Sequence, residues 1–194
     1  MLRTAEDIFD EWLVLSYQTG EPGALRELVA RWQTRLYRHA RRLIDRADAA
    51  EDVTQEAWLA IMRGLMRLDD PACFGPWAYR IVTNKCRDWV RHQKRQRARG
   101  VHEDGDIGRA TIAAPTGSAC GVAAEDDEIL ELRRAMRELS PIHRSVLALH
   151  YLDGMGVAAI AIAMGVPQGT IKSRLHHARE RLRANIEHNE RNHS

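Results

Sequence analysis

A segment without hydrophobic periodicity divides the chain and limits it to two separately folded parts. Residues 100–124 include a run of small residues at 113–119, and no apolar period spans the segment. On both sides of it, apolar residues recur every three or four positions, which is typical of amphipathic helices. Because the segment has the composition of a linker, we expect two helical units joined by a flexible connection.

The first part of the chain predicts four helices. Their expected ranges are 7–19, 25–43, 49–68 and 74–95. Glycine, proline or acidic residues interrupt the pattern at 20–23, 45–48 and 69–71. In the first helix, Ile8, Trp12 and Leu15 stand at helical spacing and predict its apolar face. Four helices with short connections can enclose one core, so an all-α domain is expected.

The second part predicts four further helices, of which the last is long. Their expected ranges are 127–138, 141–152, 157–164 and 168–187. Ser140 offers an N-cap, and Pro141 follows it at the first helical position.

Three residues near the end of the chain have the spacing that a helix-turn-helix needs. Ala161 is small enough for two helices to approach, Gly165 can adopt a left-handed turn, and Ile171 can pack the second helix on the first. The side chains presented outward after the turn are Gln168, Thr170, Lys172, Ser173, Arg174, His176 and His177. Such groups bind phosphate oxygens and base edges, whereas an ordinary helical hairpin with a polar face is the structural alternative.

Charge is distributed unevenly, although the formal net charge is only +2. Basic residues dominate 85–99, acidic residues dominate 103–128, and 172–183 is basic again. Two basic stretches on either side of an acidic one favour two surfaces that face nucleic acid, the alternative being solvated helix faces.

Several classes of protein are not expected from this sequence. The three cysteines, Cys73, Cys86 and Cys120, form no close pair, which argues against a disulfide framework. The nine histidines form no HExxH motif, and no glycine-rich phosphate loop is present, so neither a metal, a cofactor nor an enzyme is expected. No apolar run approaches the roughly 20 residues of a membrane span, and the N-terminus does not resemble a signal peptide. We therefore expect a cytoplasmic protein without a membrane partner.

Three motifs, in order along the chain, resemble extracytoplasmic-function sigma factors. Residues 48–58, DAAEDVTQEAW, resemble region 2.2, and residues 74–91, FGPWAYRIVTNKCRDWVR, resemble regions 2.3 and 2.4. Residues 139–183, which include the sequence GTIKSRL at 169–175, resemble region 4. The resemblance implies a non-catalytic subunit that binds core RNA polymerase, recognises the minus-ten and minus-thirty-five promoter elements and promotes opening of the DNA. It also implies a region 2 domain over residues 1–97, a flexible linker over 98–124 and a region 4 domain over 125–194.

The resemblance implies a docking surface for polymerase on the third helix. Asp52, Gln55 and Glu56 match family positions that bind the beta-prime clamp, and their spacing puts them on one face. On another face, Val53, Ala57 and Ile61 can pack inward. The region 4 domain would meet the beta flap.

The resemblance also assigns a minus-ten surface to the fourth helix. Its expected residues are Trp77, Tyr79, Arg80, Asn84, Lys85, Arg87 and Arg91. Asn84 can donate to and accept from a base that has left the duplex, while the basic residues neutralise phosphates. Residues 69–73 are expected to help form the base pocket. Core packing is the alternative for Trp77 and the preferred interpretation of Trp89, and Asp88 with Arg91 is expected to be a surface pair.

The minus-thirty-five surface lies on the last helix. Lys172, Ser173, Arg174 and His177 match family positions that contact this element, and Thr170 and His176 belong to the same outward surface. The chain departs from the usual pattern at Ala159, where a glutamate is common, and at His177, where arginine is frequent. Both departures predict altered sequence preference.

The sequence leaves two other functions as alternatives. A stand-alone helix-turn-helix regulator would leave residues 48–58 without a role. A protein that only sequesters a partner would not need the basic surfaces. An anti-sigma protein is a further possible partner, because many family members have one.

Overall fold

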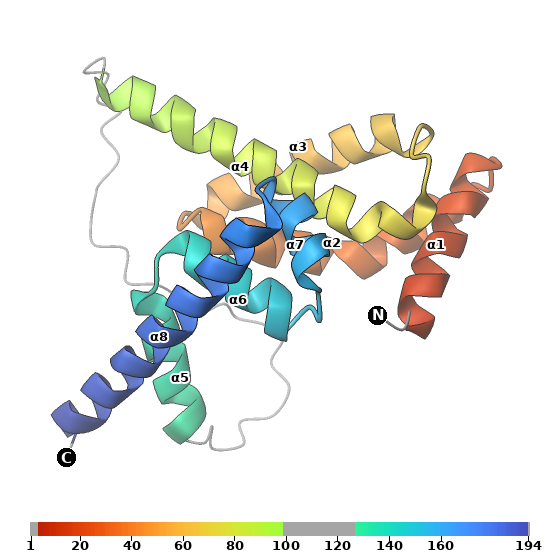
Figure 1. Ribbon diagram of the computed structural model, residues 1–194. Coiled ribbons are helices and arrows are strands. Elements are labelled where there is room, and N and C mark those ends of the chain that lie inside the picture. Colours follow the sequence, from red (N-terminus) through yellow and green to blue (C-terminus); the bar gives the residue numbers. More distant parts are fainter. Residues whose placement is uncertain (1–3, 99–126, 194) are drawn as a thin grey trace.

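The computed structural model describes residues 4–98 and 127–193, all of whose regular structure is helical. Figure 1 shows the arrangement of these helices. Their bounds are α1 Ala5–Gln18, α2 Ala24–Leu43, α3 Ala47–Leu65, the short 3-10 helix η1 Pro71–Cys73, α4 Phe74–Ala98, α5 Asp127–Glu138, α6 Pro141–Tyr151, α7 Val157–Met164 and α8 Gln168–His193. The expected all-α fold is confirmed, while the expected linker at 98–124 lies almost entirely outside the described residues.

The first unit is built by α1 to α4 around one apolar core. α2 packs against α1, α3 and α4, and so occupies the centre of the unit. Residues that share an inward stripe of α3 are almost completely buried, as their spacing predicts: Val53, Ala57 and Ile61. The polar segment 45–48, expected to be a turn, is helical in its second half, because α3 begins at Ala47.

The face of α1 that packs on the core is opposite to the face that its apolar spacing predicts. Ile8, Trp12 and Leu15 are about half exposed, whereas Leu13 and Val14 are 2% and 0% exposed. The expected apolar face of this helix was therefore wrong.

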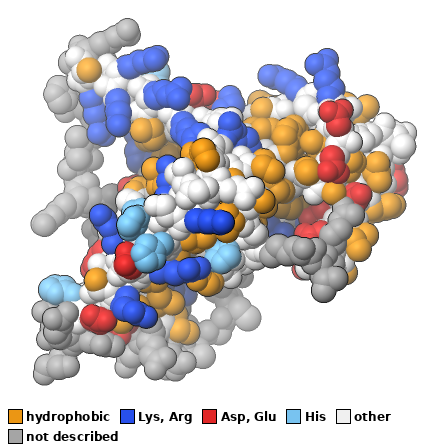
Figure 2. Space-filling model, in the orientation of Figure 1, with side chains coloured by type: hydrophobic (Ala, Val, Ile, Leu, Met, Phe, Trp, Pro, Cys, Tyr) orange, Lys and Arg blue, Asp and Glu red, His pale blue; other side chains and the backbone are white. Residues whose placement is uncertain are grey.

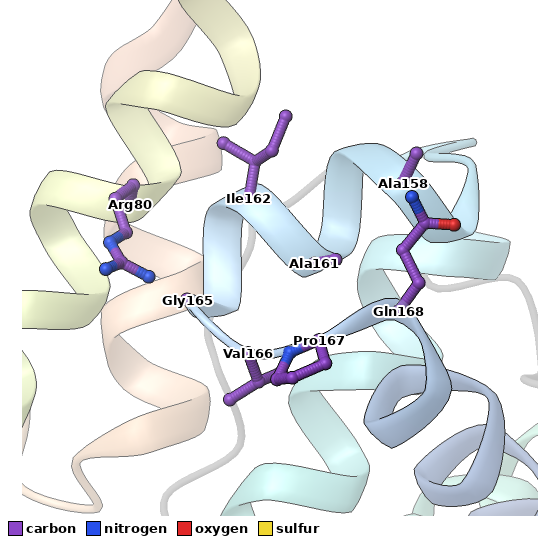
Figure 3. A pocket seen from close by; sticks show the side chains of 8 residues that line it. All are labelled: Arg80, Ala158, Ala161, Ile162, Gly165, Val166, Pro167 and Gln168. Atoms are coloured by element: carbon purple, nitrogen blue, oxygen red, sulfur yellow. The ribbon is translucent and has the colours of Figure 1, made fainter.

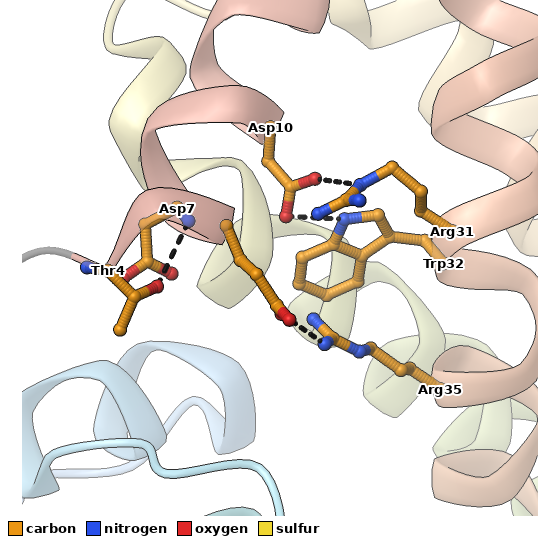
Figure 4. A network of polar contacts seen from close by, with 7 residues as sticks. Thr4, Asp7, Asp10, Arg31, Trp32 and Arg35 are labelled. Carbon is orange, nitrogen blue, oxygen red and sulfur yellow. Dashed lines mark hydrogen bonds and ion pairs between the residues drawn. The ribbon is translucent and has the colours of Figure 1, made fainter.

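A buried carboxylate explains the orientation of α1. Asp10 is only 5% exposed, and its carboxylate accepts hydrogen bonds from Arg31 Nε at 2.7 Å and Trp32 Nε1 at 3.0 Å (Figure 4). A buried carboxylate needs such donors, and α2 supplies both. The polar pairing with α2 thus fixes which face of α1 is inside.

The second unit follows its local sequence signals closely. Ser140 is the N-cap of α6, its Oγ accepts from the His143 N–H at 3.4 Å, and Pro141 occupies the first turn. α5, α6 and α7 all pack against α8, which is the longest helix of this unit. Within 4–98 and 127–193, no helix is both long and apolar enough to cross a membrane.

The two units lie against each other. α7 packs on α4 and α6 packs on α2, and buried apolar residues from both units form one continuous cluster. His39 of α2 is fully buried at this boundary, between Thr83 Oγ1 at 2.9 Å and Ser145 Oγ at 3.2 Å. Burial, and to a smaller extent Arg42, lower the pKa of His39 to about 3, so its ring is neutral.

We predict that Asp10→Ala lowers the free energy of unfolding by about 3 kcal/mol, because it leaves buried donors without their acceptor. The matched control is Glu6→Ala, which removes the exposed Glu6–Arg35 ion pair and should cost less than about 1 kcal/mol. Urea titration followed by tryptophan fluorescence measures both, since all tryptophans lie between residues 12 and 89. Equal losses in the two variants would contradict this account of α1.

Candidate nucleic-acid interface

The turn between α7 and α8 has helix-turn-helix geometry. Gly165 ends α7 in the left-handed region, with φ 61° and ψ 47°, which favours glycine. The Val166 N–H donates to the Ala161 carbonyl at 3.1 Å and closes the turn, and Ile171 is fully buried beneath it. The structural roles predicted for these residues are confirmed.

The first turns of α8 present a polar and basic face. Lys172, Ser173, His176 and His177 are exposed, while Thr170 and Arg174 are half-buried. Figure 2 shows basic and histidine side chains gathered over α8 and, above it, basic side chains over the C-terminal part of α4. The structure therefore brings together all the residues predicted for the minus-thirty-five surface on one helix.

A carboxylate lies between the two histidines of this face. Glu180 Oε1 is 3.2 Å from His176 Nε2, and Glu180 Oε2 is 3.4 Å from His177 Nδ1. The three ligand atoms lie within 4.8 Å of one another, although their spacing in the sequence is not that of an HExxH motif. The His177 side chain is 59% exposed and so is not packed against a neighbouring helix.

The residues of α4 that are predicted to contact DNA lie in three different environments. Asn84 and Arg91 are exposed, and Arg91 pairs with Asp88 at 3.3 Å, as predicted. Lys85 is bound by Glu56 of α3 at 2.9 Å. The exposed side of α4 is therefore basic and adjoins α3.

The two aromatic residues predicted for this surface differ in burial. Tyr79 is 2% exposed and packs edge-on against Trp32 and His39. Burial, and next the Asp153 carboxylate, raise the pKa of the Tyr79 phenol. Trp77 is half-buried: it leans on Phe74, and its ring would lie 2.8 Å from a Cβ added at Gly64. The burial of Tyr79 leaves it no direct access to DNA in this conformation.

Arg80 and Arg87 lie between α4 and α7. Arg80 lines an open pocket of about 590 Å³ together with Ile162, Gly165 and Gln168 (Figure 3). Arg87 donates to the carbonyl of Met164. Arg87 is therefore bound by the end of α7, and the Arg80 guanidinium lies beside Gly165.

The third helix carries a separate exposed stripe. Asp52, Gln55 and Glu56 are all exposed, as their spacing predicts. Further along, the stripe becomes apolar with Leu59, Met62 and, directly after the last helical residue, Met66, which are 52%, 38% and 55% exposed. The prediction from sequence missed these three residues, although their spacing of three and four from Gln55 onward marks the same face.

Comparisons with known proteins identify the two units. Residues 28–96 match the Sigma-70 region 2 family, and residues 129–182 match the Sigma-70 region 4 family. The chain is 32% identical over 168 residues to the ECF RNA polymerase sigma factor SigE of Mycolicibacterium smegmatis, covering 85% of this chain but only 63% of that relative. It is 30% identical over 184 residues to the ECF RNA polymerase sigma-E factor of Escherichia coli K12, covering 92% and 94% of the two chains.

A solved structure has the same fold. CnrH, determined in complex with the cytosolic domain of CnrY, superposes with a TM-score of 0.62 over 92% of this chain and 97% of that one, at 23% identity. The models of both sigma-70 regions match this chain, and the alignment with the E. coli relative spans 94% of that protein. The chain therefore belongs to the ECF group of RNA polymerase sigma factors, which are non-enzymatic factors for transcription initiation.

Proposed function

We propose that this chain docks on core RNA polymerase through α3 and reads two promoter elements with its two units. The observation that carries the proposal is that α3, α4 and α8 each have an exposed face and that these three faces are separate. In this proposal the region 2 domain comprises residues 1–97 and the region 4 domain residues 125–194. Two weak contacts on one rigid platform act together, so the complex binds more tightly and specifically than either unit.

The docking face of α3 combines charge with exposed apolar surface. Asp52, Gln55 and Glu56 supply polar groups for the beta-prime clamp, and Leu59 and Met62 extend the contact with apolar area. Central apolar burial surrounded by polar contacts is the usual composition of a protein interface. The region 4 domain contacts the beta flap in the same complex.

The exposed side of α4 faces the minus-ten element. Asn84 carries both a donor and an acceptor for the edge of an extruded base, and Arg91 lies two turns along the helix for the backbone. Holding an unstacked base offsets part of the cost of opening the duplex. The half-buried Trp77, and residues 69–73 around η1, shape the neighbouring pocket.

The start of α8 enters the major groove of the minus-thirty-five element. Lys172, Ser173 and Arg174 offer cationic and hydroxyl groups within the first two turns after the helix-turn-helix turn. Thr170, His176 and His177 complete this surface. Ala159, half-buried in α7, has no side chain that could reach the neighbouring turn.

An anti-sigma protein is proposed as a further partner. The support is a solved structure of the same fold, the sigma factor RpoE of Bartonella quintana, which was determined in complex with the anti-sigma factor NepR.

We predict that the double substitution Asp52→Ala and Gln55→Ala weakens binding to core polymerase at least about tenfold and abolishes promoter-specific run-off transcription. Both side chains are exposed, so the fold should lose less than about 0.5 kcal/mol. Glu27→Ala, an exposed acid on α2, is the control and should transcribe like the wild type. Absence of specific transcripts from the wild-type chain with core polymerase would refute the proposed function itself.

We predict that Asn84→Ala slows DNA opening about three- to tenfold, because a hydrogen-bonding partner of the extruded base is lost. The comparison uses run-off transcription from a duplex and from the same template already mismatched across the minus-ten element. Premelting should restore most of the activity. If it restores none, Asn84 does not act at the opening step.

We predict that His177→Arg strengthens binding to the upstream element about three- to tenfold at pH 7.5, because arginine carries a permanent charge and two parallel donors. His188→Arg, at an exposed position further along α8, is the control. Fluorescence anisotropy at fixed ionic strength measures all three chains. Identical affinities of the wild type and the His177→Arg variant would remove His177 from the DNA surface.

A further inference from the structure

Two histidines and a glutamate gather on the exposed side of α8. The carboxylate of Glu180 turns one oxygen to each imidazole, at 3.2 Å from His176 Nε2 and 3.4 Å from His177 Nδ1. One ligand atom from each of the three side chains lies within 4.8 Å of the other two. Because all three side chains are more than half exposed, an ion from solvent can reach them, and they can turn to surround it.

The helix itself produces this grouping. Side chains three and four residues apart are neighbours on a helix surface, and Glu180 follows His177 by three residues and His176 by four. The two imidazole rings are themselves neighbours, with centroids 5.5 Å apart. Since every ligand atom comes from one stretch of α8, binding an ion requires rotation of side chains and no movement of one helix against another.

Glu180 has no strong cationic partner, although the helix around it is basic. Within residues 4–98 and 127–193, the ion pairs of Glu180 are those with the two histidines, and none joins it to a lysine or an arginine. The adjacent Arg179 is turned to α6, where its Nε donates to the hydroxyl of Tyr151 at 2.7 Å. An ion that binds between the three side chains therefore displaces no lysine or arginine from the carboxylate.

The ligand atoms select the kind of ion. Two imidazole nitrogens and one carboxylate oxygen are ligands that Zn²⁺ and other late first-row divalent cations take, whereas Mg²⁺ and Ca²⁺ prefer oxygen ligands alone. Zn²⁺ in proteins is usually bound by four ligands. Three protein ligands therefore leave one position for an oxygen from outside the protein.

We propose that α8 binds a zinc-type divalent cation through His176, His177 and Glu180, and that the bound ion strengthens the contact of α8 with DNA phosphates. The second half of this inference rests on the proposed role of α8 in binding DNA. The ion adds two positive charges one helical turn from Lys172 and Arg174 and offsets the charge of the carboxylate. Its remaining position accepts a phosphate oxygen, which adds to the electrostatic part of the affinity.

The first experiment tests the metal site without DNA. The full chain, without a histidine tag and freed of metal with EDTA, competes for Zn²⁺ with a chromophoric chelator. We expect the wild type to bind Zn²⁺, and His177→Ala and Glu180→Gln each to weaken binding at least about tenfold, because each removes one ligand. His188→Ala, at an exposed histidine further along α8, is the matched control and should bind Zn²⁺ like the wild type. Zn²⁺ should also raise the Tm of the wild type more than that of His177→Ala.

The second experiment adds DNA. Fluorescence anisotropy with a duplex of mixed sequence, at fixed pH and ionic strength, compares affinities in Zn²⁺ and in EDTA. We expect Zn²⁺ to strengthen binding of the wild type about threefold or more. His177→Arg carries a permanent charge but lacks one ligand, so its affinity should be the same in both buffers. This variant also controls for direct binding of Zn²⁺ to the duplex.

The outcomes separate the metal site from the proposed function. If His177→Ala and Glu180→Gln bind Zn²⁺ as tightly as the wild type, the ion is held elsewhere, for example by the thiol of Cys73, and the site is refuted. If Zn²⁺ binds at the site and weakens or does not change duplex binding, while His177→Arg strengthens it, the contact between ion and phosphate is refuted. If Zn²⁺ binds at the site but neither Zn²⁺ nor His177→Arg changes affinity for the duplex, the metal site stands and the proposed role of α8 fails.

Discussion

Ring packing between α2 and α4 is the contact on which the remaining structure depends. The Trp32 and Tyr79 rings lie 5.7 Å apart, and the His39 and Tyr79 rings lie 5.0 Å apart, all edge-on. Trp32 also donates to Asp10 and so orients α1, while His39 contacts Ser145 and so reaches the second unit. Aromatic groups of this size carry much of the energy of a small core, and here the same rings also set the positions of helices on both sides.

Sequence reasoning succeeded where the deciding partners are neighbours along the chain. The Ser140 cap and the left-handed Gly165 depend on a few adjacent residues, and both were predicted. The inward face of α1 depends on Arg31 and Trp32, about twenty residues away, which make burial of Asp10 favourable. Apolar spacing alone selected the opposite face, since it gives no weight to a carboxylate with two donors from another helix.

At the candidate site, too, the sequence predicted the exposure of some residues correctly and of others not. Motif and spacing selected exposed groups such as Asp52, Asn84 and Lys172 on three helices. They also selected Tyr79 and Arg80, which the structure uses for packing within the first unit and against the second. α4 meets the core on one side, α7 on another and solvent on the third. A polar residue on such a helix has no sequence signature that tells which of the three it faces.

Gly165 is held by two requirements that do not depend on each other. Its backbone lies where other residues are strained, and its missing side chain leaves the space that Arg80 fills. If Gly165 were substituted, a second substitution that shortened the side chain at position 80 would remove only the overlap with the new side chain. The backbone strain in the turn would remain within the second unit. In a genetic screen, a second substitution in α4 would therefore not restore the function lost by substituting Gly165. A substitution that disturbs only the contact between the units could be compensated by a second substitution in α4.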